Sequence, residues 1–345
     1  MSARPVNRDA WRSLVVEEPI DPALPIIDAH HHLWPEPPVP HLEAYGIEAL
    51  KIDKRTSGHN IVATVFVEAF TRYRNEGPAK FKPLGETEYV AQVARDADRE
   101  GGTAVGCCAG IVAHADMLLG AEVDEVLTAH RAAAPERLRG IRHLIAHDPD
   151  YPGVLPSQPG TLQNPAFRAA FARLAAHDLS FDVWLMHPQL GELAEVAALF
   201  PETTIVLDHV GGPMGTGRYA NGAGNGFEEW RRGMALVAAR PNVVVKLGGL
   251  NMEFTRLGAP LDAERPWTSE EMARAQGRHI LTTIDLFGPS RCMFESNFPV
   301  DRMSTGATVL WNCFKRLAER FTSSEKSELF FDTAARVYRL PTLKP

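Results

Sequence analysis

The sequence has few cysteines, and their spacing marks no disulfide framework. Its 345 residues include four cysteines, and none of them stands in a Cys-x-x-Cys pair: Cys107, Cys108, Cys292 and Cys313. Such spacing is not typical of a small domain held together by disulfides. Nothing marks a paired base beside Cys107 or Cys108, so we interpret both as small core residues and not as nucleophiles. We therefore expect a reduced, cytoplasmic location.

The sequence also lacks a long apolar run and an excess of positive charge. Residues 1–25 carry scattered charges and prolines but no apolar core of a signal peptide, and no later segment is long enough to span a bilayer. The net charge is −7, from 36 basic and 43 acidic residues. A mildly acidic protein is poorly suited to hold a phosphate backbone. We expect a small-molecule substrate, no nucleic acid and no membrane partner, and we leave a homo-oligomer open.

Strand-like and helix-like segments alternate along the rest of the chain. Capping signals mark three helix starts, at Asn164-Pro165, Thr268-x-x-Glu271 and Thr322-x-x-Glu325. Long polar loops are expected at 33–60, 71–85, 214–226 and 252–267. Helices are expected at 87–100, 115–134, 164–177, 189–200 and 227–240, at 268 onward, and twice after the last strand. Strands are expected at 26–32, 61–69, 104–112, 138–145, 180–186, 203–207, 242–250 and 292–299.

Eight buried-type strands that alternate with helices predict a closed (β/α)8 TIM barrel of the α/β class. Continuous apolar strands joined by helical crossovers are typical of parallel sheets. Eight such units fit a chain of this length, so we predict one domain, 1–345, with an N-terminal extension at 1–25 and C-terminal helices at 305–345. A doubly wound open sheet is the alternative, which is weakened because no glycine fingerprint follows the first strand.

The first predicted strand ends in a histidine-rich stretch. Side chains alternate along a strand, so Asp28, His30 and His32 are expected to share one face. Two imidazoles from one strand end make half of a tetrahedral zinc site. A polar cluster without metal is the alternative, whereas an expression tag is disfavoured because a strand precedes the run.

Polar residues also stand at the carboxyl ends of later strands, where active sites of such barrels lie. Histidines at three separate strand ends indicate a shared polar site. The residues at these strand ends are Glu68, Arg142, His187, His209, Lys246 and Asn297, with Asp301 just beyond.

Four motifs follow one another along the chain: Asp28-Ala29-His30-His31-His32, His187-Pro188, His209-Val210-Gly211-Gly212 and Ser296-Asn297-Phe298-Pro299. Together they resemble the amidohydrolase superfamily, in the branch of pyrone-dicarboxylate lactonase, sugar-lactone hydrolases and aminocarboxymuconate-semialdehyde decarboxylase. The resemblance extends from residue 26 to about residue 338. It implies that His30, His32 and His187 are metal ligands and that His209 is the polarising or acid/base histidine.

The chain departs from the family pattern on its last strand. Asn297 stands where the family has an aspartate, and an amide is a weaker ligand that cannot take a proton from water. No lysine stands on the fourth strand, so a two-metal centre is not expected. Two interpretations stay open: one divalent metal, zinc by preference, on three histidines with water at the open position, or metal-independent polarisation of the substrate carbonyl.

Several further residues have two interpretations each. Glu295 shares strand parity with Asn297 and could orient His30 or His32, so we group it with His209 and Asn297 as candidate catalytic residues. His209 is the better base because its ordinary pKa lies near neutrality.

The candidate substrate-binding residues are equally ambiguous. Arg142 suits a carboxylate clamp or an internal ion pair, and Glu68 is open in the same way. Lys246 could bind substrate or only pair with Glu295 or Glu68. Trp34 could line the pocket mouth or pack beneath a loop.

Together these features favour a hydrolase that opens a lactone of a carboxylated or sugar-acid compound by adding water. The first alternative is non-oxidative decarboxylation of an aromatic or enol acid. The second is a barrel that binds a ligand without catalysis, for which Asn297 is the best support and against which the intact histidine set argues.

Overall fold

The computed structural model describes residues 8–37, 43–149, 157–222 and 225–340. Eight parallel strands pair in sequence order from β1 to β8. The end of β8 returns to β1, where the backbone N–H of Asn297 donates to the carbonyl of His30 at 2.9 Å. The predicted (β/α)8 barrel is therefore confirmed, and the sequential strand order excludes the doubly wound sheet. The strands are β1 (Ile26–His31), β2 (Ile61–Val67), β3 (Gly110–His114), β4 (Leu138–Arg142), β5 (Ser180–Val183), β6 (Ile205–Leu207), β7 (Val243–Leu247) and β8 (Cys292–Phe294).

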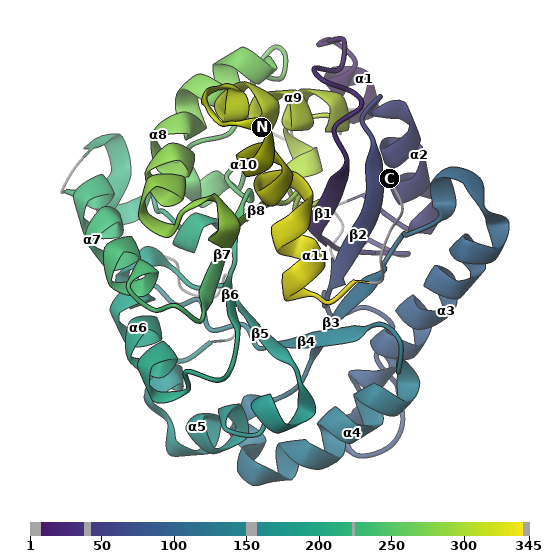
Figure 1. Cartoon of the computed structure of the whole chain (residues 1–345), viewed down its shortest axis with the longest axis vertical. Coiled ribbons are helices and arrows are strands. Elements are labelled where there is room, and N and C mark those ends of the chain that lie inside the picture. The colour runs from purple at the N-terminus through teal and green to yellow at the C-terminus, as the bar shows by residue number, and fades with distance from the viewer. Residues whose placement is uncertain (1–7, 38–42, 150–156, 223–224, 341–345) are drawn as a thin grey trace, which may run out of the picture.

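Helices surround the barrel, and the C-terminal helices cross one of its ends (Figure 1). The predicted caps at Asn164, Thr268 and Thr322 are all present and begin α5, α8 and α10. No helix in the described ranges is both long and apolar enough to cross a membrane. The helices are α1 (Arg8–Arg12), α2 (Ile47–Thr56), α3 (Leu84–Glu100), α4 (Val123–Ala133), α5 (Pro165–Phe171), α6 (Leu190–Leu199), α7 (Gly226–Ala238), α8 (Ser269–Phe287), α9 (Ala307–Leu317), α10 (Ser323–Ser327) and α11 (Thr333–Val337).

The apolar side chains form two main layers. A large cluster lies between the strands and the helices, as expected for parallel strands buried on both faces. A smaller cluster fills the amino end of the barrel, where Ile27, Val65 and Met293 pack with Val337 and Tyr338 at the end of α11. This apolar floor leaves the carboxyl ends of the strands for polar side chains.

A β-bulge in β1 corrects the expected strand faces. Asp28 pairs with Thr64 and His31 pairs with Phe66, so the pairing moves three residues along β1 but only two along β2. Asp28 consequently points away from His30 and lines a small cavity outside the barrel with Thr64. The prediction that Asp28 shares a face with His30 and His32 is wrong because regular alternation stops at the bulge.

Other differences concern element ends. β3 begins at Gly110 and not at 104, because a 3-10 turn and positive-φ residues occupy the segment before it. The expected helix 115–134 is interrupted at Gly120, where φ is 63°, and α4 begins at Val123. Helix α3 begins inside the expected loop 71–85. Parts of the expected loops 33–60 and 214–226 and of the expected extension 1–25 and C-terminal segment 305–345 lie outside the described residues, and the single-domain organisation stays a prediction.

Candidate active site

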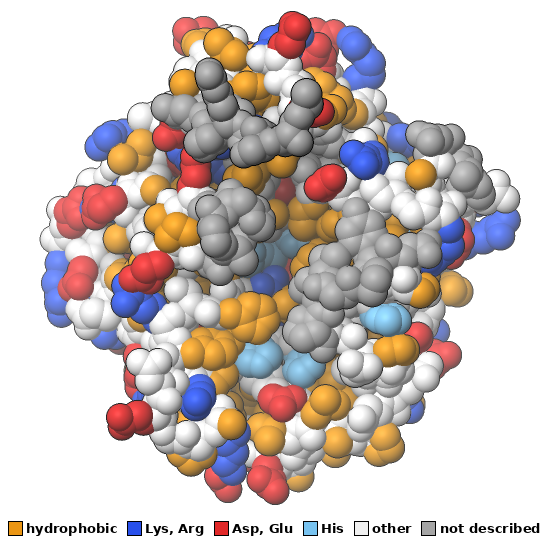
Figure 2. All heavy atoms as spheres, turned by 180° about the vertical axis from the view of Figure 1, so that it is seen from behind, with side chains coloured by type: hydrophobic (Ala, Val, Ile, Leu, Met, Phe, Trp, Pro, Cys, Tyr) orange, Lys and Arg blue, Asp and Glu red, His pale blue; other side chains and the backbone are white. Residues whose placement is uncertain are grey.

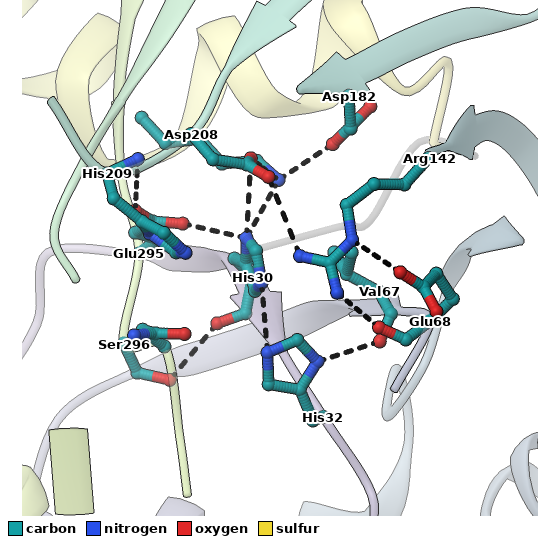
Figure 3. A network of polar contacts seen from close by, with 12 residues as sticks. His30, His32, Val67, Glu68, Arg142, Asp182, Asp208, His209, Glu295 and Ser296 are labelled. Atoms are coloured by element: carbon teal, nitrogen blue, oxygen red, sulfur yellow. Dashed lines mark hydrogen bonds and ion pairs between the residues drawn. The ribbon is translucent and has the colours of Figure 1, made fainter. Parts of the chain in front are cut away.

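Most of the residues predicted for the site meet at the carboxyl end of the barrel. The barrel end opposite α11 is hollowed at its centre, and histidine side chains are visible inside the hollow (Figure 2). Side chains from β1, β2, β4, β5, β6, β7 and β8, or from just beyond them, converge there into one polar network (Figure 3). The network joins His30, His32, Glu68, Arg142, Asp182, Asp208, His209, Lys246 and Glu295.

Glu295 connects two of the histidines (Figure 3). Its Oε1 lies 2.7 Å from Nδ1 of His209, and its Oε2 lies 3.0 Å from Nδ1 of His30. Burial alone would raise the pKa of Glu295, but His209 and His30 hold it below its ordinary value. Burial alone would lower the pKa of His209, yet Glu295 raises it above the ordinary value. An ionised Glu295 that accepts both N–H groups leaves Nε2 of each ring free to act as a base or ligand.

His30 and His32 have the geometry of a pair of zinc ligands. Their Nε2 atoms are 3.2 Å apart, and the rings are nearly perpendicular. Two nitrogens at the usual zinc distance in a tetrahedral site would be about 3.3 Å apart. Nδ1 of His32 lies 2.9 Å from the carbonyl of Val67, to which it donates, so Nε2 carries the lone pair. Burial lowers the pKa of both rings, which favours the neutral form that binds metal.

Lys246 competes with Glu295 for Nδ1 of His30. Its ammonium Nζ lies 3.1 Å from that atom. If Lys246 donates to Nδ1, the His30 proton sits on Nε2 and is donated to His32. If Nδ1 carries the proton and donates to Glu295, two lone pairs face each other 3.2 Å apart, an arrangement that requires a cation. The residues present therefore fit a single cation held by His30 and His32.

His187 lies apart from this pair. It stands on a 3-10 turn (His187–Gln189) beyond the end of β5. Its Nδ1 accepts the backbone N–H of Met214 at 3.2 Å, and its ring packs on Tyr219. The remaining proton is thus on Nε2, which is buried and has no partner among the described residues.

The described residues do not bring ligand atoms of His30, His32 and His187 within 4.8 Å of one another. Within the described ranges, the one group of His, Cys, Asp or Glu ligand atoms lying within 4.8 Å of one another comes from His30, His209 and Glu295. The hydrogen bond between His209 and Glu295 and the 3.0 Å contact of Glu295 with His30 explain this closeness without a metal. A ligand role for His187 stays a prediction and requires its ring to change tautomer.

Carboxylates surround both buried cations of the site. Lys246 lies 2.7 Å from Asp182 and 3.0 Å from Asp208, so its partners are neither Glu295 nor Glu68 as considered from the sequence. Arg142 donates through Nε to Oε1 of Glu68 at 2.9 Å and through Nη2 to the Glu68 carbonyl, and Asp208 lies 3.6 Å from its Nη1. All five side chains are buried. The internal ion-pair interpretation thus fits Arg142, Glu68 and Lys246 better than direct substrate binding.

Sequence reasoning missed Asp182 and Asp208. Asp208 directly follows β6 and carried the signal of a carboxylate at a strand end, whereas Asp182 lies within β5 and carried the signal of a charged residue inside a buried strand. Burial alone would raise the pKa of Asp208, but Lys246 and His30 hold it well below the ordinary value.

The family model described as amidohydrolase matches residues 27–340. The chain belongs to the amidohydrolase family. It is 34% identical to the uncharacterized protein y4mH of Sinorhizobium fredii over 258 residues, which cover 75% of this chain and 76% of y4mH. It is 29% identical over 206 residues to L-fucono-1,5-lactonase of Burkholderia multivorans, which covers 59% of this chain and 64% of the lactonase. The family and its lactonase relatives make this chain a hydrolase.

Solved structures support the same family. An amidohydrolase from Burkholderia multivorans, crystallised with bound zinc, superimposes with a TM-score of 0.69 at 25% identity over 92% of this chain and 99% of its own. A protein described as a 2-pyrone-4,6-dicarboxylic acid hydrolase from Pseudomonas putida gives 0.60 at 16% identity, covering 92% and 98%. A 5-carboxyvanillate decarboxylase from Sphingomonas paucimobilis gives 0.55 at 13%, covering 92% and 100%. The last two likenesses show the fold alone.

Two tryptophans flank the histidines of this amidohydrolase. Trp34 stacks on His32 with a ring separation of 5.9 Å and an interplanar angle of 7°. Trp184, which sequence reasoning missed although it directly follows β5, contacts His209 edge to face at 5.9 Å. Both indole N–H groups are buried without a partner among the described residues. The two rings supply apolar surface and unused donors beside the histidines.

Asn297 lies just beyond β8, close to the histidine pair. Its side chain is buried, its φ is +53°, and its Nδ2 donates to Oδ1 of Asp301 at 3.0 Å. Its own Oδ1 has no partner in the described part of the chain. The amide nitrogen is therefore already hydrogen-bonded, whereas the side-chain carbonyl oxygen can still accept a hydrogen bond.

Proposed function

We propose that this amidohydrolase opens an uncharged, hydroxylated sugar lactone by adding water to its carbonyl carbon. The L-fucono-1,5-lactonase relatives support a lactone. The observation that carries the choice of a neutral substrate is the pairing of both buried cations with carboxylates. A dicarboxylated lactone would bring two further negative charges toward Glu68, Asp208 and Glu295, with neither Arg142 nor Lys246 free to receive them.

His209 serves as the general base in this proposal. Its Nδ1–H is held by Glu295, so Nε2 is available to take a proton from water. The water oxygen bonds to the lactone carbon, and the ring C–O bond then breaks. The proton held by His209 passes to the departing ring oxygen, which becomes the hydroxyl of the hydroxy acid.

We further propose one divalent cation, zinc by preference, on His30 and His32. The support is the 3.2 Å separation of their Nε2 atoms and the His32 tautomer. When bound, zinc supplies polarisation of the carbonyl and lowers the pKa of a bound water. The third protein ligand in this proposal is His187, as the family resemblance implies.

A substrate panel tests the proposed function. The purified protein is incubated with neutral sugar 1,4- and 1,5-lactones, with pyrone-dicarboxylate and with carboxylated phenols, while acid release and CO₂ release are measured separately. We expect acid release from neutral lactones and a much lower kcat/KM for the dicarboxylate. Preference for the dicarboxylate would overturn the choice of substrate, and CO₂ release without acid would replace hydrolysis by decarboxylation.

A further inference from the structure

We propose that Asp301 is a positioning residue that turns the amide of Asn297 so that its carbonyl oxygen holds the attacking water. The proposal rests on the hydrolytic function proposed above. It assigns Asn297 a role as a neutral hydrogen-bond acceptor and gives Asp301 the task of keeping the NH₂ end away from the water.

The contacts of Asn297 define which end of its amide is free. Its backbone N–H donates to the carbonyl of His30 at 2.9 Å, which places the residue beside the histidine pair. Its Nδ2 donates to Oδ1 of Asp301, while its Oδ1 is buried and has no partner among the described residues. Buried polar atoms are normally paired, so an unpaired acceptor beside a reacting centre indicates a place for a donor.

Asp301 also holds the neighbouring loop. Its second oxygen, Oδ2, accepts the backbone N–H of Asn251 at 3.1 Å in the segment that follows β7. This segment passes over the general base, because a Cβ added at Gly249 would collide with the ring of His209. Burial raises the pKa of Asp301 to about 7, and its contacts with Asn251, His209 and Asn297 oppose this shift by favouring the ionised carboxylate. Asp301 thus fixes two elements that border the same reacting water.

The chemistry suits an acceptor that does not itself take the proton. Water donates one hydrogen to the Asn297 oxygen, and this contact aims an oxygen lone pair at the lactone carbon. The other hydrogen passes to His209. A carboxylate at position 297 would compete for that proton, whereas the amide leaves the proton to the histidine.

The substitution Asp301→Asn should invert the Asn297 amide. The backbone N–H of Asn251 is fixed, so the amide introduced at position 301 must turn its oxygen to it and its NH₂ toward Asn297. Asn297 must then turn its own oxygen to that NH₂, and its NH₂ faces the water. In the double variant Asn297→Asp with Asp301→Asn, the introduced NH₂ donates to the new carboxylate, whose second oxygen restores an acceptor toward the water.

The chain offers a matched control in Asn312. This buried residue of α9 donates its Nδ2 to Oε2 of Glu17 at 2.9 Å, on the N-terminal segment and not on a strand end. The variant Asn312→Asp places a carboxylate opposite that of Glu17, just as Asn297→Asp places one opposite that of Asp301. We expect it to change thermal stability and to leave kcat unchanged.

The experiment measures kcat and KM on the best neutral lactone of the panel for the wild type, both single variants, the double variant and the control. We expect Asp301→Asn to lower kcat by about 100-fold at nearly constant KM, as is common when a group aligned with the transition state is lost. The kcat of the double variant should be at least tenfold higher than that of Asp301→Asn. A double variant no better than Asp301→Asn overturns the proposal, and so does a rise in KM at unchanged kcat, which would place the oxygen against a substrate hydroxyl.

A second measurement separates this proposal from the proposed function. If the wild type hydrolyses no lactone, the proposed function fails and the role in holding water fails with it. The pairing itself is still tested by thermal unfolding, because the two substitutions should be less destabilising together than the sum of their separate effects. Additive effects would overturn the pairing even in an active enzyme.

Discussion

At the residue scale, the site is governed by which atom of each polar side chain is already in use. Glu295 accepts from His209, Val67 accepts from His32, and Met214 donates to His187. These contacts fix the tautomers of three rings, whereas Nδ1 of His30 lies within reach of both Glu295 and Lys246. Sequence alone places histidines at strand ends, but it gives no information on tautomers.

Glu295→Gln should separate orientation from folding. A glutamine side chain has one oxygen and one NH₂, so it cannot accept from both His30 and His209. One ring must change tautomer, and we expect kcat to fall about 10²- to 10³-fold, within the range attributed to general acid–base catalysis. Metal affinity should also fall about 10- to 100-fold, as is usual when a residue behind a ligand is altered.

The measurements are lactonase kinetics, zinc titration and a circular dichroism melt. Glu125→Gln, on the surface of α4 beside Lys80, is the control and should match the wild type in all three. A Glu295→Gln protein with unchanged kcat and zinc affinity would contradict the orienting role.

At the element scale, small irregularities decide which residues enter the site. The bulge in β1 turns Asp28 outward while keeping His30 and His32 inward. His209 and Asn297 both have positive φ, a backbone conformation that neither residue type predicts by itself. A regular strand pattern therefore predicts the strand and its apolar faces but errs in the last residues, which are the functional ones.

A hydrogen bond joins the end of the C-terminal helix to the site. Tyr338, just beyond α11, donates its hydroxyl to Oδ2 of Asp182 at 2.6 Å, and the same carboxylate holds Lys246. The helix thus closes the amino end of the barrel and reaches the lowest layer of the polar network. This link joins residues 156 positions apart in sequence, and no local pattern could predict it.

Tyr338→Phe should destabilise the protein by about 1.5–3 kcal/mol, the range for a hydrogen bond to a charged group. Lysine 246 still neutralises Asp182, so we expect kcat to stay within a few fold of the wild type. Urea denaturation followed by tryptophan fluorescence gives the free energy of unfolding. Tyr45→Phe removes a similar bond to Asp53 outside the barrel and serves as the comparison. Loss of activity without loss of stability in Tyr338→Phe would show that α11 acts on catalysis and not on folding.

At the scale of the whole molecule, the architecture was predictable because eight apolar strands and their helices repeat with a regular period. The carboxyl-end location of the histidines was predictable for the same reason. The partners of Lys246 and Arg142 were not, because each cation lies among several strand-end carboxylates and only the closed barrel selects between them. The contacts of His187 with Tyr219 and Met214 depend on tertiary packing and were not predictable either.

Metal removal and replacement test the molecule as a whole. A chelator followed by zinc should abolish and then restore activity, and zinc content should return to about one ion per chain. A cation that binds only the folded state stabilises it by about 2.7 kcal/mol at a free concentration 100 times its dissociation constant, so the melting temperature should rise with added zinc.

His32→Gln should remove both the zinc and this rise, because His32 presents a fixed Nε2 lone pair to the cation. His187→Gln should lower the zinc affinity, because His187 is the proposed third ligand. An unchanged zinc affinity would show that His187 only accepts the hydrogen bond from Met214. Zinc near two ions per chain, or activity that the chelator leaves intact, would contradict a single catalytic cation.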